Sequence, residues 1–206
     1  MLQAVNLECV RGQRTLFTGL SFDVEPGQLF WVAGPNGSGK TSLLRILCTL
    51  LPAEAGQVRW GGTDVRKLGE AFAADLLYIG HAPAVKDDLT ARENLRFALA
   101  QHGMEASDGQ LERALARFGL AGREDLPARV LSQGQRRRVG LSRLVFGAAQ
   151  RLWILDEPLA ALDAAAVELV RAELAAHLAR DGVVVLTTHQ GVDFAGLRVQ
   201  RLQLDA

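Results

Sequence analysis

The sequence contains no long hydrophobic run. None of its apolar stretches approaches the ~20 residues that a membrane-spanning helix requires. The N-terminal stretch carries Glu8 where a signal peptide would have its apolar segment. We therefore expect a chain that stays in the cytoplasm and has no transmembrane domain of its own.

An excess of charge of either sign is also missing. The 23 basic and 23 acidic residues cancel, and the pI is near 6.9. A neutral chain has no overall attraction to nucleic acid or anionic lipid, so no nucleic-acid partner is expected. Cysteine is scarce as well, and Cys9 and Cys48 form neither a CxxC pair nor a His/Cys metal spacing. A cytoplasmic setting disfavours a disulfide, so both are predicted to be ordinary core residues.

What the chain does contain is an alternation of short apolar runs and segments of helical period. At 206 residues it fits one domain, 1–206, with an inserted subdomain. Runs rich in Val, Ile and Phe between helical segments predict an α/β fold, a mixed sheet flanked by helices. The predicted strands are Leu2–Val10, Ser21–Val24, Leu29–Ala33, Gln57–Trp60, Leu76–Ile79, Leu152–Leu155, Val183–Thr187 and Val199–Leu204.

Two parts of this α/β pattern are distinctive. The early strands are predicted to be antiparallel. From about 83 to 147 the strand signals vanish and the apolar spacing becomes helical, which predicts an inserted helical subdomain. The segment Gly103–Gly109 is its expected loop.

Residues 34–41, GPNGSGKT, match the phosphate-binding pattern G-x-x-x-x-G-K-[ST] between an apolar strand and a helix. The glycines let backbone N–H groups converge on phosphate oxygens at the positive end of the helix. Lys40 is expected to bridge the terminal phosphates, and Thr41 to offer its hydroxyl to Mg²⁺. The alternative is a glycine-rich turn that matches by chance, which the flanking strand and helix disfavour.

The apolar strand Leu152–Leu155 ends in two carboxylates, Asp156 and Glu157. Asp156 is placed to join the Mg²⁺ shell, and Glu157, one residue further, to act as general base on an attacking water. Taken alone, two acidic residues at a strand end are explained equally well as a solvent-exposed strand end without a catalytic role. The phosphate-binding pattern at 34–41 favours the catalytic interpretation.

A further motif, LSQGQ at Leu131–Gln135, precedes a helix predicted to begin around Arg136. Alone it is explained as well by a loop and an N-capped helix. Together with PLAALD at Pro158–Asp163 and TTH at Thr187–His189, however, the five motifs in this order resemble the ATP-binding cassette (ABC) ATPases, whose signature is typically LSGGQ. The resemblance covers nearly the whole chain and implies the ABC ATPase fold on a P-loop core, with ATP hydrolysis as the activity.

By this resemblance, the signature completes the nucleotide site of an opposite subunit, so two cassettes would sandwich two ATP molecules and a homodimer is expected. Asp163 is the D-loop residue, and the catalytic residues are Glu157, His189 and Lys40. Thr41 and Asp156 would bind Mg²⁺, the cofactor that accompanies ATP. The signature residues expected to act in trans are Leu131, Ser132, Gln133, Gly134 and Gln135. The residues expected to bind ATP are Gly34, Pro35, Asn36, Gly37, Ser38, Gly39, Lys40, Thr41, Ser42 and Arg11.

The sequence departs from the family pattern at two positions. His81 occupies the Q-loop position, where most members have a glutamine that contacts Mg²⁺ and the water. Arg11 occupies the position of the aromatic that usually stacks on adenine, a role that a guanidinium can also fill. Among the other histidines, His102 and His177 are predicted to lie on the surface. The run Arg136–Arg138 is predicted to be a solvated or ion-paired face, with nucleic-acid binding as the alternative.

A narrower resemblance rests on GHAP at Gly80–Pro83, RLWILDEP at Arg151–Pro158 and TTHQ at Thr187–Gln190. These segments are similar to the ATP-binding subunits of the cytochrome c maturation (Ccm) system, the haem exporter. The resemblance implies integral membrane permease subunits as partners and a peripheral position on the inner face of the cell membrane. No Cys-Pro or CxxCH haem motif occurs, so the chain is expected to drive such a complex without holding haem.

Other classes stay open at this point. The chain could serve a different ABC transporter. A soluble ABC protein of translation or DNA repair would share the motifs, but typically carries two cassettes or a long coiled-coil insertion. A P-loop small-molecule kinase would share residues 34–41 but lack the signature and His189. Neither the transported substrate, its direction nor the subunit stoichiometry follows from the sequence.

Overall fold

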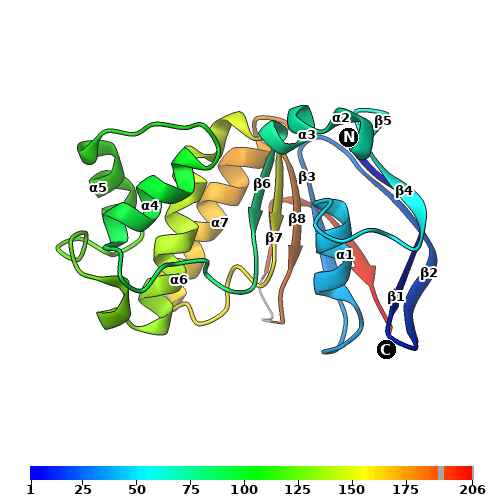
Figure 1. The fold of residues 1–206 in the computed structure, drawn as a ribbon, viewed down its shortest axis with the longest axis horizontal. Coiled ribbons are helices and arrows are strands. Elements are labelled where there is room, and N and C mark those ends of the chain that lie inside the picture. The colour runs from blue at the N-terminus through cyan, green and yellow to red at the C-terminus, as the bar shows by residue number, and fades with distance from the viewer. Residues whose placement is uncertain (190–192, 206) are drawn as a thin grey trace. The chain divides into compact units, whose positions relative to one another are not determined.

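The structure is a computed structural model that describes residues 1–189 and 193–205. It divides into two compact units (Figure 1). The first comprises Met1–Tyr78, Gln150–Glu157 and the C-terminal part from Ala175, and the second comprises Ile79–Ala149 and Pro158–Leu174.

The first unit contains a four-stranded antiparallel sheet of order β2-β1-β4-β5. Every second residue of β1 is buried over much of its length, as expected for a strand with one face on a core. This sheet confirms the predicted antiparallel N-terminal β part, but the strand at Gln28–Ala33, which is also early in the chain, pairs in parallel with strands of the second sheet. Its strands are β1 (Leu2–Arg11), β2 (Arg14–Val24), β4 (Ala55–Trp60) and β5 (Thr63–Asp64).

A five-stranded sheet of order β6-β7-β8-β3-β9 carries the phosphate-binding segment. Strands β7, β8, β3 and β9 pair in parallel, and β7, β8 and β3 run side by side in Figure 1. β7 and β8 are buried at every position, which explains their continuous apolar sequences. The strands are β3 (Gln28–Ala33), β6 (Leu76–Ile79), β7 (Leu152–Leu155), β8 (Val183–Thr187) and β9 (Arg198–Gln203).

Three helices accompany these sheets: α1 (Lys40–Leu47), α2 (Val65–Leu68) and α3 (Glu70–Asp75). α1 contacts β8 and buries an apolar side made of Leu43, Leu44, Ile46 and Leu47. The core of the unit includes Cys9 and Cys48, both free thiols, as predicted. Burial raises the pKa of both thiols, so they stay protonated at neutral pH.

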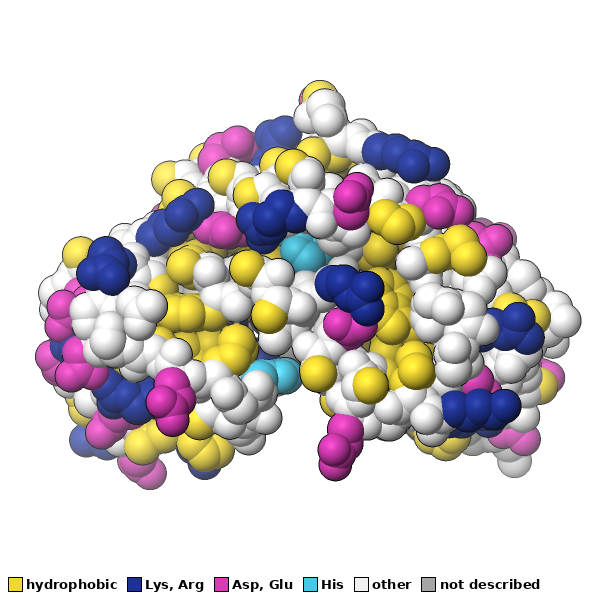
Figure 2. All heavy atoms as spheres, turned by 90° about the horizontal axis from the view of Figure 1, so that it is seen from above, with side chains coloured by type: hydrophobic (Ala, Val, Ile, Leu, Met, Phe, Trp, Pro, Cys, Tyr) yellow, Lys and Arg dark blue, Asp and Glu magenta, His cyan; other side chains and the backbone are white. Residues whose placement is uncertain are grey.

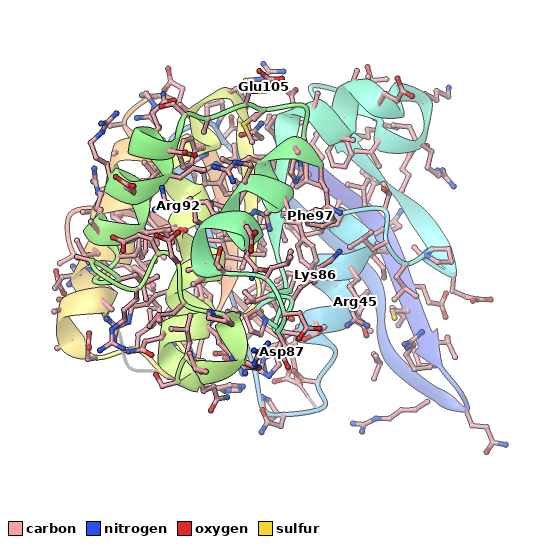
Figure 3. The ribbon with its side chains drawn as sticks, turned by 60° about the vertical axis from the view of Figure 1, so that its left-hand side comes forward. Arg45, Lys86, Asp87, Arg92, Phe97 and Glu105 are labelled. Carbon is pink, nitrogen blue, oxygen red and sulfur yellow. The ribbon has the colours of Figure 1, made fainter. Side chains whose placement is uncertain are left out.

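The second unit is helical. Its elements are α4 (Ala91–Ala100), α5 (Asp108–Arg117), η1 (Ala128–Val130), α6 (Gln133–Leu141), η2 (Ser142–Ala149) and most of α7 (Ala164–Leu178). α4, α5 and α6 each begin with a capping box, in which a Ser or Thr hydroxyl and a Glu or Gln side chain satisfy the free N–H groups. The shared core includes Leu95, Leu99, Leu111, Leu115 and Val139. Arg92 adds ion pairs to Glu112 and Asp125 at the surface (Figure 3).

The predicted α/β class is confirmed, with two differences in detail. The strand predicted at Ser21–Val24 begins at Arg14, because Gly19 at φ 63° and register shifts along the β1/β2 pair disturb the alternation that marks a strand. β5 and the short helices α2 and α3 carry too few residues to give a periodic signal. The predicted single domain with a helical subdomain at about 83–147 stays a prediction.

The predicted surface position of His177 is wrong. The side chain is 2% exposed and its ring stacks on Trp153 at 3.9 Å between centroids. Gly182 closes over it, since a Cβ on that glycine would lie 2.2 Å from His177 Nε2. Burial, with a smaller effect of Arg180, lowers the pKa of His177 from 6.5 to about 4. The imidazole is therefore neutral in the folded chain at neutral pH.

This buried histidine predicts a loss of stability in acid. Between pH 6.5 and 4, His177 is protonated in the unfolded chain but neutral in the folded chain. The free energy of unfolding should therefore fall as the pH decreases, by about 3 kcal/mol once both states are protonated. Urea unfolding across this range should show a shallower dependence for His177→Phe, which keeps the ring stack without titrating. Parallel curves for the two proteins would contradict the assignment.

Candidate functional site

Residues 34–39 form a tight loop between β3 and α1, and Lys40 and Thr41 are the first two residues of α1. Gly39 is the residue before α1, at φ 98°, and Gly34 has φ 150°. A Cβ on Gly34 would lie 2.4 Å from the Leu204 carbonyl oxygen and 2.6 Å from Ser38 Oγ, so only glycine fits there. Pro35, Asn36 and Gly37 are exposed at the tip of the loop.

The polar side chains of this loop are arranged for an anion. Lys40 is buried, and its Nζ donates to the carbonyl oxygens of Gly34 at 2.8 Å and Pro35 at 2.9 Å. The Ser38 hydroxyl is buried without a hydrogen-bond partner. A cation, an unsatisfied hydroxyl and a helix N-terminus together match the chemistry of phosphate oxygens.

A chain of hydrogen bonds joins this loop to the ends of two neighbouring strands. Thr41 Oγ1 donates to Asp156 Oδ2 at 2.8 Å, and Thr187 Oγ1 donates to Asp156 Oδ1 at 2.7 Å. The Glu157 N–H in turn donates to Thr187 Oγ1 at 2.8 Å. Because β7 and β8 pair in parallel, with Leu155 opposite Leu186, their carboxyl ends meet at one edge of the sheet. The arrangement holds both oxygens of the buried Asp156 carboxylate.

Glu157 lies at the same edge and faces His189. Its Oε2 accepts a hydrogen bond from the His189 backbone N–H at 3.2 Å, and its Oε1 lies 3.3 Å from the ring nitrogen His189 Nε2. The Glu157 backbone has φ 52°, an unfavourable conformation for a residue with a side chain. Such strain persists only where the surroundings fix it, as at functional sites. The Glu157 side chain is 12% exposed and that of His189 is 47% exposed, so solvent reaches the pair.

The oxygen atoms at this edge of the sheet are suitable ligands for Mg²⁺. Within residues 1–189 and 193–205, no group of three or more His, Cys, Asp or Glu side chains could hold a metal ion by itself. Mg²⁺ usually takes one or two protein oxygen ligands and completes its shell with phosphate and water. The Thr41 hydroxyl and the Asp156 carboxylate, already in contact, supply that minimal set.

The residues predicted to bind the rest of a nucleotide lie on β1 and α1. Arg11 is exposed at the end of β1, opposite Arg14. Ser42 lies in the first turn of α1, where its hydroxyl contacts the Cys9 thiol. Sequence reasoning missed Leu16 and Phe17, which lie at 3.1 and 3.4 Å from a Cβ built on Gly39 and so line the loop with apolar surface.

The signature segment lies in the second unit, at the start of α6. Ser132 is the N-cap: its Oγ accepts the Gln135 N–H at 3.2 Å, and its own N–H donates to Gln135 Oε1 at 2.9 Å. Leu131 is buried beneath it, and Gln133 is exposed. The helix therefore begins at Gln133, not around Arg136. The spacing of Ser132 and Gln135 is itself a capping box and could have given the correct start.

The D-loop packs against this helix start. A Cβ on Gly134 would lie 2.8 Å from the Ala161 carbonyl oxygen, so Gly134 permits a close approach of backbone. Asp163 Oδ1 accepts the Ala166 N–H at 2.8 Å, and Asp163 Oδ2 lies 3.2 Å from Arg138 Nη2. Two of the predicted motifs, the signature and the D-loop, thus touch within one unit.

The arginine run is only partly the predicted surface face. Arg136 pairs with Asp87 at 2.8 Å and Arg138 with Asp163. Arg137, in contrast, is 5% exposed, and its Nη1 donates to the carbonyl oxygens of Gly80 and His81, both at 2.9 Å. His81 itself is exposed. Its predicted role at the Q-loop position stays a prediction.

The surface in Figure 2 shows basic side chains scattered among acidic ones rather than gathered into one field. Several arginines of the described residues form ion pairs with acidic side chains, among them Arg66, Arg96, Arg129 and Arg171. Exposed pairs of this kind contribute little to stability, and mixed charges of this kind do not form an extended basic surface.

Residues 3–160 match the ABC transporter family. The chain is 55% identical to the cytochrome c biogenesis ATP-binding export protein CcmA of Nitrosomonas europaea over 204 residues, covering 99% of this chain and 95% of the relative. It is 56% identical to the CcmA protein of Aromatoleum aromaticum, covering 95% of this chain and 91% of the relative. The protein of the same name from Salmonella typhi is 48% identical, covering 99% of this chain and 97% of the relative.

Solved structures confirm the predicted fold. A Pyrococcus furiosus protein described as a putative ABC transporter ATP-binding protein superposes with a TM-score of 0.80 at 21% identity, covering 98% of this chain and 96% of that one. A dimeric ATP-binding cassette in a post-hydrolysis state, bound to ADP and Pi, superposes with a TM-score of 0.78 at 21% identity, covering 92% and 88% of the two chains.

Proposed function

The chain belongs to the ABC transporter family and, within it, to the cytochrome c biogenesis ATP-binding export proteins CcmA, and on this premise we propose how its residues bind and hydrolyse ATP and what they drive. The chain is an ABC-type ATPase, with hydrolysis of ATP to ADP and phosphate coupled to export. The observation that carries the residue roles is the hydrogen-bond chain from Thr41 through Asp156 and Thr187 to Glu157.

The triphosphate binds at the loop 34–41. Its oxygens take the place of the loop carbonyls around Lys40 Nζ and give the buried Ser38 hydroxyl its partner. Thr41 and Asp156 would hold Mg²⁺, which would supply positive charge to neutralise the phosphates. Leu16 and Phe17 offer apolar surface near the loop, with Arg11 stacking on the adenine.

Hydrolysis depends on Glu157 as the general base for the attacking water. His189 holds the Glu157 carboxylate through its backbone N–H and its ring nitrogen. Thr187 fixes the Glu157 backbone by accepting its N–H. His189 positions the carboxylate and, from its solvent-exposed side, contacts the γ-phosphate. Lys40 stabilises the negative charge that develops on the transferred phosphoryl group.

The signature acts across a homodimer. Ser132 and the N-terminus of α6 present donors and a positive dipole end to the γ-phosphate bound by a second copy of the chain. Gly134 and Asp163 tie this helix start to the D-loop. Support for a dimer comes from the similar fold of a dimeric cassette bound to ADP and Pi.

The assembly we propose is the haem exporter complex of cytochrome c maturation. No helix in the described residues is long and apolar enough to cross a membrane. In this complex the chain acts as a peripheral subunit on the inner face of the cell membrane, bound to integral permease subunits, as expected for a relative of ATP-binding export proteins. The names of relatives that are 45–56% identical support this complex over another ABC transporter.

Deletion of the gene tests this proposal. Covalent attachment of haem to c-type cytochromes should fall at least about tenfold while b-type cytochromes and haem synthesis remain, because the complex loses its source of conformational work. Haem staining of separated membrane proteins measures the attachment, and a plasmid-borne wild-type copy is the control. Normal holocytochrome c in a deletion strain without a second copy would contradict the assignment to this complex and leave the ATPase assignment intact.

A further inference from the structure

Arg137 is an unusual residue for a helix of this kind because its guanidinium is buried. The residue is 5% exposed, and Nη1 donates to two successive carbonyl oxygens, those of Gly80 and His81, at 2.9 Å each. A buried cation is costly unless hydrogen bonds compensate it, and bonds from a charged donor are about twice as strong as neutral ones. If the segment Gly80–Pro83 moved away from α6, the guanidinium would therefore either be exposed to solvent or stay buried without these acceptors.

A second contact joins the same segment to the same helix. Gly140 lies three residues after Arg137, on the same side of α6, and a Cβ there would lie 3.0 Å from the Pro83 carbonyl oxygen. A side chain at this position would push the Pro83 carbonyl away by a few tenths of an ångström, so glycine allows the close approach. Arg137 and Gly140 thus hold the segment Gly80–Pro83 at two points about one helical turn apart.

The other end of α6 carries the signature. Ser132 caps the helix, and Gly134 packs on the Ala161 carbonyl oxygen. A helix of this length, nine residues, moves as a rigid element, since its backbone hydrogen bonds and its buried Val139 and Leu141 fix its geometry. A displacement at one end is therefore passed to the other.

We propose that Arg137 is the positioning residue that fastens the His81 segment to the signature helix, so that His81 and Ser132 move together during the ATPase cycle. The inference rests on the proposed function, because it needs Ser132 to act on bound nucleotide, and on the predicted role of His81 at the Q-loop position. Because its guanidinium is buried, Arg137 is not placed to bind nucleotide itself. It acts through the backbone of His81, and its loss changes how often the site is correctly assembled, not how tightly ATP binds.

The test compares Arg137→Met with Arg136→Met in the complete complex with its membrane subunits. Methionine keeps the apolar stem and removes the donors. Arg136 is a matched control on the same helix, and it pairs with Asp87, which is labelled in Figure 3. Partner-stimulated kcat should fall about tenfold for Arg137→Met, with KM for ATP within about twofold of wild type. Arg136→Met should stay within about twofold on both counts.

A double-mutant cycle separates positioning from mere folding. In a His81→Ala background, Arg137→Met should cost less than about twofold in kcat, because the group that it positions is already gone. Arg137→Lys, which keeps a donor, should recover part of the activity in the wild-type background. Equal losses in both backgrounds, or no loss for Arg137→Met in a folded complex, would overturn the proposal.

Failure of this inference is distinguishable from failure of the proposed function. Lys40→Ala serves as the reference for the nucleotide site in the same assay. If Lys40→Ala lost hydrolysis while the Arg137 cycle was additive, the ATPase site would stand and the positioning role would fall. If Lys40→Ala hydrolysed ATP at the wild-type rate, the nucleotide site itself would be wrong.

Discussion

Replacement of Glu157 by Gln should slow ATP hydrolysis by about 10³-fold while ATP affinity stays within about threefold of wild type. The amide is nearly the same size and still accepts the His189 N–H through its oxygen, so the site keeps its shape. It cannot take a proton from water at neutral pH. Steady-state phosphate release gives the rate, and a fluorescent ATP analogue gives the affinity.

The control for this substitution is Glu54→Gln, the same chemical change at an exposed residue of the first unit. It should hydrolyse ATP like the wild type. Lys40→Ala should differ from Glu157→Gln in its affinity for ATP, which should be reduced, because Lys40 belongs to the segment that holds the phosphates. Hydrolysis by Glu157→Gln at more than about a tenth of the wild-type rate would remove the general-base role.

The loop and the strand end were readable from the sequence because each is a local pattern. The spacing of residues 34–41 fixes which groups face a phosphate, and the apolar run before Asp156 and Glu157 fixes which strand end they occupy. Thr187 was predicted only as part of a motif. That its hydroxyl holds both Asp156 and the Glu157 backbone follows from β7 and β8 being parallel neighbours, which residue spacing does not determine.

Arg137 and His177 escaped sequence reasoning for a common cause. Both are polar residues in helices, and a charged or polar residue there is ordinarily on the solvent side. Arg137 is buried because the segment at Gly80 and His81, more than fifty residues earlier in the chain, supplies carbonyl acceptors. His177 is buried because the chain returns over it at Gly182. Neither tertiary contact leaves a periodic signal in the sequence.

Two inactive variants should restore hydrolysis when they share a dimer. Ser132→Arg places a bulky cation at the start of α6 and removes the hydroxyl cap, so this chain cannot complete its partner's site. Lys40→Ala disables the phosphate loop but keeps an intact signature. A mixed dimer therefore has one site with a sound loop from the first chain and a sound signature from the second.

The expected recovery follows from symmetry. Equal amounts of the two chains give about half mixed dimers, each with one sound site of two, so activity should return to about a quarter of wild type if sites act independently. Differently tagged copies, isolated by two successive affinity steps, give the mixed dimer directly, and each variant assayed alone is the control. Purified mixed dimers with no activity above the single variants would show either that Ser132 acts within its own chain or that both sites must be intact for either to work.

A second mixed dimer, with Ser132→Arg and Lys40→Ala on one chain and no substitution on the other, decides between these two explanations. It also retains one loop and one signature that are sound, but they lie on the same chain. With composite sites, each of its two sites therefore has one damaged half and activity stays absent, whereas sites built within one chain would leave the unmutated chain active.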